Sequence, residues 1–224
     1  MSALKLLLVF ALLGMSVMGA SAEYTPKGQK AISAIAPAFP HLTFIWAIAE
    51  GDLDGDGISD LALVVTGQRG ENAPREERLF VLTGNPDGSY RVLSVSDEFC
   101  HVSKFYNLDI GKNSVFVQGF GYADAARASS VTLQFRYNAK LKDLELIGEQ
   151  SLEENYEDGS YYRVSVNYLT KAAIHSRHAE KRHKEAKVRF NNGAILRLQG
   201  FDCSNHSLPD STVYIDKNFK VQDR

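Results

Sequence analysis

Residues 43–66 read TFIWAIAEGDLDGDGISDLALVVT, two apolar runs joined by an acidic segment rich in glycine. The runs Thr43–Ala49 and Leu61–Thr66 are short and rich in β-branched and apolar residues, which is typical of strands. The segment between them carries aspartates at loop positions 1, 3, 5 and 9: Asp52, Asp54, Asp56 and Asp60. Carboxylates crowded this densely repel one another unless a cation neutralises them. The stretch therefore predicts a β-hairpin whose loop binds a hard dication.

Calcium is the dication that this spacing favours, because it accepts about six to eight oxygen ligands in flexible loops. The expected ligands are Asp52, Asp54, Asp56, the main-chain carbonyl of Ile58, and Asp60 directly or through water. Gly57 holds the sixth position, where such a loop turns sharply. A helix-loop-helix site would add a glutamate at the twelfth position, which is Leu63 here, so we expect a loop flanked by strands.

The segment Gly51–Leu63 resembles the calcium loop of FG-GAP and VCBS-type repeats, the modules of integrin α-chain propellers and of many bacterial secreted proteins. The resemblance implies that the four aspartates bind calcium. Those modules occur in tandem, whereas this sequence has one loop, so we do not expect a propeller closed by this chain alone. The remaining layout is similar to bacterial secreted or periplasmic envelope proteins with a single loop, whose role is unknown.

The rest of the chain predicts one helix and many short strands. Thr25-Pro26 is typical of a helix N-terminus, and Ile32 and Ile35 recur at helical spacing before Pro37. Further strands are expected at Leu79–Thr83, Tyr90–Ser94, Ser114–Phe120, Val131–Tyr137, Leu144–Gly148, Tyr161–Tyr168, Lys187–Phe190, Ile195–Leu198 and Thr212–Ile215. No alternation of strands and helices appears. We predict a mainly β fold, an antiparallel sandwich or a curved meander, with one N-terminal helix.

The N-terminus has the layout of a cleavable secretory signal. Lys5 precedes an apolar stretch, and Ala20-Ser21-Ala22 ends it before Glu23. We therefore expect a signal peptide over residues 1–22 and a single β-rich domain over residues 23–224, exported to a periplasm or outside the cell. No later apolar run is long enough to span a bilayer.

Charge and cysteine content restrict the partners. The sequence has 25 Lys and Arg against 27 Asp and Glu, so a basic surface for nucleic acid is not expected. In an oxidising compartment, Cys100 and Cys203 can form one disulfide or remain two buried thiols. We expect the partner to be a protein or glycan of the cell envelope.

A basic, histidine-rich run covers residues 171–185. It is either a solvated strand pair or a short helix. Its concentrated positive charge also suggests a patch for an anionic polysaccharide or lipid headgroup, made of His175, Arg177, His178, Lys181, Arg182 and His183. A transition-metal site is disfavoured, because the histidines do not share one helical face and cations surround them.

The expected function is a non-enzymatic one, in which calcium pins a β-hairpin of an envelope binding protein. The alternative is a hydrolase of envelope polymers that uses paired carboxylates. Its candidate carboxylates are Glu149, Glu153, Glu154, Glu157 and Asp158. No serine or cysteine motif for a nucleophile is present, so no catalytic residue is assigned.

Overall fold

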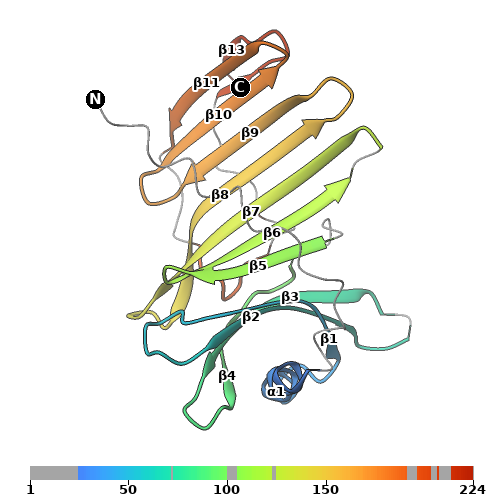
Figure 1. The fold of residues 1–224 in the computed structure, drawn as a ribbon, viewed down its shortest axis with the longest axis vertical. Coiled ribbons are helices and arrows are strands. Elements are labelled where there is room, and N and C mark those ends of the chain that lie inside the picture. The colour runs from blue at the N-terminus through green and yellow to red at the C-terminus, as the bar shows by residue number, and fades with distance from the viewer. Residues whose placement is uncertain are drawn as a thin grey trace.

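The computed structural model describes residues 25–71, 73–99, 105–122, 125–190, 196–202, 206 and 213–223. These residues form one helix and thirteen strands in two large antiparallel sheets and one small hairpin (Figure 1). Their bounds in chain order are α1 (Pro26–Ile35), β1 (Leu42–Gly51), β2 (Asp60–Gln68), β3 (Arg75–Gly84), β4 (Tyr90–Val95), β5 (Phe105–Gly111), β6 (Ser114–Tyr122), β7 (Arg127–Asn138), β8 (Asp143–Asn155), β9 (Ser160–Asn167), β10 (Ala172–Ala179), β11 (Arg182–Arg189), β12 (Val213–Ile215) and β13 (Val221–Asp223). The predicted mainly β fold with an N-terminal helix is confirmed.

Helix α1 starts as the sequence predicts. The Thr25 side chain accepts a hydrogen bond of 3.0 Å from the Gly28 N–H, and Pro26 occupies the first turn. This cap satisfies one of the amide groups that have no partner inside the helix. The helix buries Ala31 and Ile35 against the first sheet. Within the described residues, no helix is long and apolar enough to cross a membrane.

The first sheet is a four-stranded meander in the order β1-β2-β3-β4. Its strand β2 is buried continuously from Asp60 to Thr66. Since successive side chains of a strand point to opposite faces, Leu61 and Leu63 pack with α1 while Ala62 and Val64 face the other sheet. The acidic loop therefore leads directly into the most buried strand of the protein's first sheet.

The second sheet is a seven-stranded meander in which β5 to β11 follow chain order. Figure 1 shows it with the four-stranded sheet against its β5 end and strands β9 to β11 extending away. The small β12–β13 hairpin contacts β10 and β11. Both large sheets are therefore built from neighbours in sequence, which short turns can connect.

The main core lies between the two sheets. Val64 and Val81 of the first sheet pack in one cluster with Val117 and Phe135 of the second. The sheets approach most closely where β1 meets β5: a Cβ added to Gly51 would lie 2.9 Å from the Ile110 Cβ. Glycine at the end of β1 thus permits the contact that places the acidic loop beside the second sheet.

Glu76, near the start of β3, is the centre of an ion-pair cluster. Glu76 accepts hydrogen bonds from Arg69 and Arg78 and lies 2.9 Å from the His41 Nε2. Burial alone would raise the pKa of Glu76, but the hydrogen bonds from Arg78, His41 and Arg69 outweigh it and lower that pKa to about 2. The carboxylate is therefore held ionised in the folded protein.

Several strand predictions differ from the structure. Strand β5 and the short strand β13 were not predicted, and β8 runs to Asn155, well past the expected end at Gly148. The expected strand Ile195–Leu198 is wrong for its described part, where Arg197 makes only an isolated bridge with Glu145. The basic run forms the β10–β11 strand pair and no helix.

Candidate metal site

The acidic loop connects the end of β1 to the start of β2. Strand pairing closes it at Gly51 and Asp60, which are directly opposite each other. Gly55 and Gly57 have φ angles of 84° and 80°, the left-handed region that side chains with a Cβ rarely adopt. The two glycines therefore let a nine-residue loop fold back tightly, as the sequence predicts.

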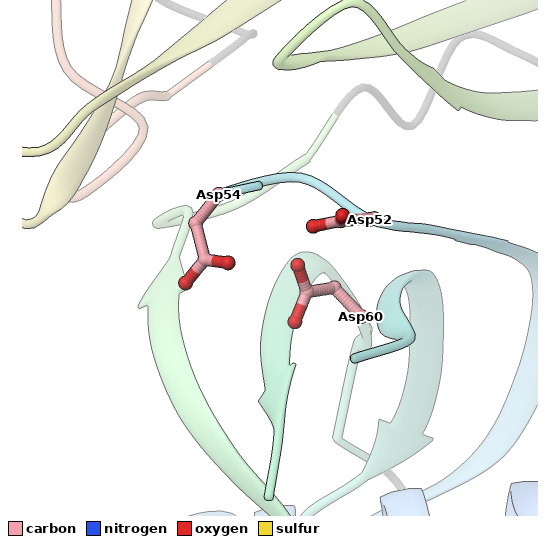
Figure 2. Close-up of side chains that lie close together, drawn as sticks. All are labelled: Asp52, Asp54 and Asp60. Atoms are coloured by element: carbon pink, nitrogen blue, oxygen red, sulfur yellow. The ribbon is translucent and has the colours of Figure 1, made fainter. Parts of the chain in front are cut away.

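Three carboxylates of this loop converge: Asp52, Asp54 and Asp60 each offer an oxygen within 4.8 Å of the others. Figure 2 shows their side chains directed toward a shared space, with Asp52 and Asp54 from the loop and Asp60 from the start of β2. Two oxygens bonded to one hard dication at about 2.3–2.6 Å can be at most about 5 Å apart. The three aspartates can therefore hold a single metal ion.

Asp60 is the buried base of this group, with 1 % of its surface exposed. Its two oxygens accept hydrogen bonds from the Leu53 N–H at 2.8 Å and the Gly84 N–H at 3.0 Å. Burial raises the pKa of the Asp60 carboxyl, the two amide hydrogen bonds oppose that rise, and the negative charges of Asp54 and Asp56 add to it. A bound cation would reverse this penalty because it favours the ionised form.

The other aspartates shape the loop itself. Asp52 accepts the N–H groups of Gly55 and Gly57 at 2.7 and 3.0 Å, so it closes the turn around its own carboxylate. Asp54 accepts the Asp56 N–H at 3.2 Å. These bonds leave the carboxylate oxygens of the loop gathered on its inner side, where a cation would replace repulsion with attraction.

Asp56 is exposed and lies outside the three-carboxylate group. Its oxygen accepts the Ile58 N–H at 2.7 Å. Of the sequence-predicted ligands, the structure thus brings three together and places Asp56 at the loop surface. Metal ligation by Asp56 and by the Ile58 carbonyl stays a prediction.

Leu53 and Gly84 are the two site residues that sequence reasoning missed. Leu53 is fully buried in the core between the two sheets, so the loop between Asp52 and Asp54 is anchored from inside. A Cβ on Gly84 would lie 2.4 Å from the Ser59 carbonyl oxygen, so only glycine allows β3 to approach the loop and donate to Asp60. An apolar residue inside an acidic loop is the one local signal that could have revealed the anchor.

Glu50 closes the outer side of the loop. It accepts a hydrogen bond from the Ser59 hydroxyl at 2.6 Å and pairs with Lys27 of α1. The hydrogen bond from Lys27 lowers the pKa of Glu50, and that from Ser59 adds to the effect. These exposed contacts join helix, strand and loop, and their contribution to stability is small.

The six residues of the expected anion patch do not form one surface. His175 is 3 % exposed and contacts the Tyr162 hydroxyl through its Nδ1 at 2.7 Å. Because side chains alternate along β10, Arg177 shares the face of His175 while His178 lies on the other face. Arg182 faces the β12–β13 hairpin, where it donates to the Asn218 carbonyl at 2.8 Å. The basic side chains that are close together in the sequence are thus divided between the two faces of the sheet.

The carboxylates of the hydrolase alternative are also separated. Glu149 is 8 % exposed, and the Tyr168 hydroxyl and the His206 Nε2 each lie 2.7 Å from it. Burial raises the pKa of Tyr168, and the negative charge of Glu149 adds to that rise. Glu153 and Glu154 are successive residues of β8, so their side chains point to opposite faces. None of the described contacts joins two of the five candidate carboxylates.

Cys100 and Cys203 lie outside the described residues, so their pairing stays a prediction. The chain matches no family model, and neither the curated proteins nor the solved structures include a match to it. The chemistry of the metal site therefore rests on its geometry.

Proposed function

We propose that the chain is an exported calcium-binding protein in which the ion pins the β1–β2 loop. The observation that carries this proposal is the convergence of Asp52, Asp54 and Asp60 within 4.8 Å around a loop that two glycines fold tightly. An all-oxygen site suits calcium or magnesium, whereas zinc is usually bound by nitrogen and sulfur. A flexible, partly exposed loop favours calcium, because magnesium requires a near-ideal octahedron.

We also propose that the loop is of the FG-GAP and VCBS type that its sequence resembles, and that the protein is exported and acts in the cell envelope. Extracellular calcium modules have dissociation constants of about 0.1 to 1 mM, so millimolar calcium outside the cell would keep such a site occupied. The ion would then be structural: it would connect the loop to β3 through Asp60 and Gly84, which contact each other directly.

Calcium titration with matched charge variants tests this part. Asp54→Asn removes one ligand charge but keeps an oxygen that can accept the Asp56 N–H. Asp158→Asn is the control, because Asp158 is an exposed aspartate that accepts the Ser160 N–H in the β8–β9 turn. We expect calorimetry to register calcium binding and calcium to raise the melting temperature of the wild type and the control, and both effects to be strongly reduced in Asp54→Asn. Equal melting temperatures of the wild type in calcium and in chelator, with no heat at millimolar calcium, would refute the proposal.

We further propose that the protein works by binding an envelope protein or glycan through the outward face of its seven-stranded sheet. Alternation along β6 to β10 puts Phe116, Phe120 and Ile174 on the face opposite Val117 and Leu133, which pack in the core. The three outward residues are half-buried and belong to no core cluster of the described chain. A broad face with apolar and aromatic side chains supports binding more than catalysis.

Purified protein sedimented with isolated cell-wall polymer or with envelope protein in calcium tests the binding role. Ile174→Arg changes the β10 part of the outward face, and Leu169→Arg, in the exposed β9–β10 turn, is the matched control. We expect the first variant to lose co-sedimentation and the second to retain it. Equal binding by both variants, or polymer cleavage in place of binding, would contradict a role for this face.

A further inference from the structure

The β10–β11 hairpin places two histidines opposite each other. Its loop has only two residues, Glu180 and Lys181, and Glu180 has the positive φ of 51° that tight hairpin turns use. The register pairs Ala179 with Arg182, and His178 with His183. A spacing of five residues, which does not align imidazoles on a helix, therefore becomes a direct cross-strand pair.

The pair occupies the closer of the two types of cross-strand position. In a two-residue hairpin the residues that flank the loop form a hydrogen-bonded pair, so the next pair is of the non-hydrogen-bonded type, whose side chains are nearer. The ring centroids of His178 and His183 are 6.2 Å apart, with an angle of 48° between the planes. An imidazole bound to a metal at about 2 Å has its centroid about 3 Å from the ion, so two rings on one ion are about 6 Å apart or less. The ligand atoms of the two rings and of Glu185 are not gathered within 4.8 Å in the described chain, so binding to one ion requires these side chains to rotate.

Glu185 supplies a third donor on the same side. It is two residues beyond His183 on β11, so both side chains point to one face. The His183 Nε2 lies 3.5 Å from the Glu185 Oε1, and the two side chains are 47 % and 46 % exposed. A ligand set of two imidazoles and one carboxylate, with solvent on the open side, is typical of sites for borderline transition metals.

Tyr161 of β9 supports the pair from its other side. Its ring stacks on His178 at a centroid distance of 5.1 Å and an interplanar angle of 10°. This contact restricts the orientation of His178, which lowers the entropy lost when a metal orders the ring. The support comes from a neighbouring strand and is visible only in the folded sheet.

The charges near the pair are less unfavourable than the sequence indicates. Arg177, Arg182 and Lys184 all occupy the opposite face, by alternation along β10 and β11. Glu154 lies in the same cross-strand row as Tyr161 and His178. The cations that share the face on these strands are Arg163, which lies 5.9 Å from the Tyr161 ring centroid, and, further along β11, Lys187 and Arg189.

We propose that His178, His183 and Glu185 form a site for a transition-metal dication, with water completing the coordination. Among divalent ions the order of affinities places Cu²⁺ first, with Ni²⁺ and Zn²⁺ weaker. The site is separate from the loop of Asp52, Asp54 and Asp60, uses nitrogen ligands, and stands whether or not that loop binds calcium.

Cu²⁺ titration of the full chain, followed by calorimetry and by electron paramagnetic resonance, tests the proposal. The variants are His178→Ala, His183→Ala and their double, and the control is Lys187→Ala, which changes an exposed residue on the same face of β11. We expect each single histidine variant to raise the Cu²⁺ dissociation constant at least tenfold, with loss of one nitrogen ligand from the spectrum. Lys187→Ala and Asp54→Asn should bind Cu²⁺ as the wild type does.

Urea unfolding curves in the absence of metal separate a loss of Cu²⁺ binding from a loss of stability. We expect the curves of the His178, His183 and Lys187 variants to resemble that of the wild type, because these side chains are partly or fully exposed. A double histidine variant that binds Cu²⁺ as tightly as the wild type would overturn the proposal. A wild-type spectrum without two imidazole nitrogens would overturn it as well.

Discussion

Substitution of Leu53 by alanine should reveal how the metal loop is coupled to the core. Leu53 is fully buried, with an exposed fraction of 0 %, and it packs in the cluster between the two sheets. Removal of a buried leucine side chain costs about 2–5 kcal/mol, and we expect about 3–4 kcal/mol here because paired strands around the cavity cannot collapse into it. The measurement is urea unfolding in chelator.

The same substitution should weaken calcium binding. Leu53 lies between Asp52 and Asp54, and its own N–H donates to Asp60, so a loosened anchor disturbs all three carboxylates. With a dissociation constant of about 0.1 mM, calcium at about 1 mM stabilises the fold by about 1.4 kcal/mol, and a tenfold weaker site by only about 0.4 kcal/mol. Leu53→Ala should therefore lose about 1 kcal/mol of calcium-dependent stabilisation in addition to the cavity penalty.

Leu133→Ala is the matched control, because Leu133 of β7 is 1 % exposed in the same cluster and lies outside the loop. It should carry a similar cavity penalty and keep the full response to calcium. The coupling between loop and core is refuted if the two alanine variants respond to calcium equally.

Three further predictions concern stability. Glu76→Gln should remove up to about 3 kcal/mol of folding free energy, which the depressed pKa of the Glu76 carboxyl contributes. This contribution is complete above pH about 4.5 and is lost as the pH falls toward 2. In urea unfolding in chelator, the stability difference between the variant and the wild type should therefore shrink on acidification. Gly84→Ala forces a contact with the Ser59 carbonyl and should cost about 1–3 kcal/mol by thermal denaturation, whereas Gly70→Ala, which meets nothing within 4 Å, should be nearly neutral. Thr25→Ala removes the helix cap and should cost about 1 kcal/mol in the same assay; an unchanged melting temperature would argue against the cap.

The local parts of this fold could be predicted from the sequence because they depend on neighbouring residues. The β1–β2 hairpin follows from two apolar runs and a glycine-rich loop, and α1 follows from Thr25-Pro26. Strand β5 was missed although its sequence Phe105–Gly111 alternates apolar residues with Asn107 and Asp109, because no clear turn signal precedes it. Its identity as a strand depends on pairing with β6 and on contact with β1.

The carboxylates of the metal site could be predicted from the sequence, but the contacts that join the loop to the rest of the fold could not. The spacing of aspartates indicates which carboxylates meet, whereas the contact of Asp60 with Gly84 joins residues 24 positions apart. In the same way, a spacing of three puts His175 and His178 on opposite faces of a strand, and only the hairpin register pairs His178 with His183. Chemistry that depends on register cannot be deduced before the register is known.

Strand β11 is last in the order of the seven-stranded sheet, and its sequence RHKEAKVR carries four Lys and Arg. An outermost strand offers backbone groups to which another molecule could add a strand of its own. Two copies that paired through this strand would bring like charges together. This repulsion disfavours extension of the sheet from one molecule into another. High salt or added polyanions should weaken this protection against self-association.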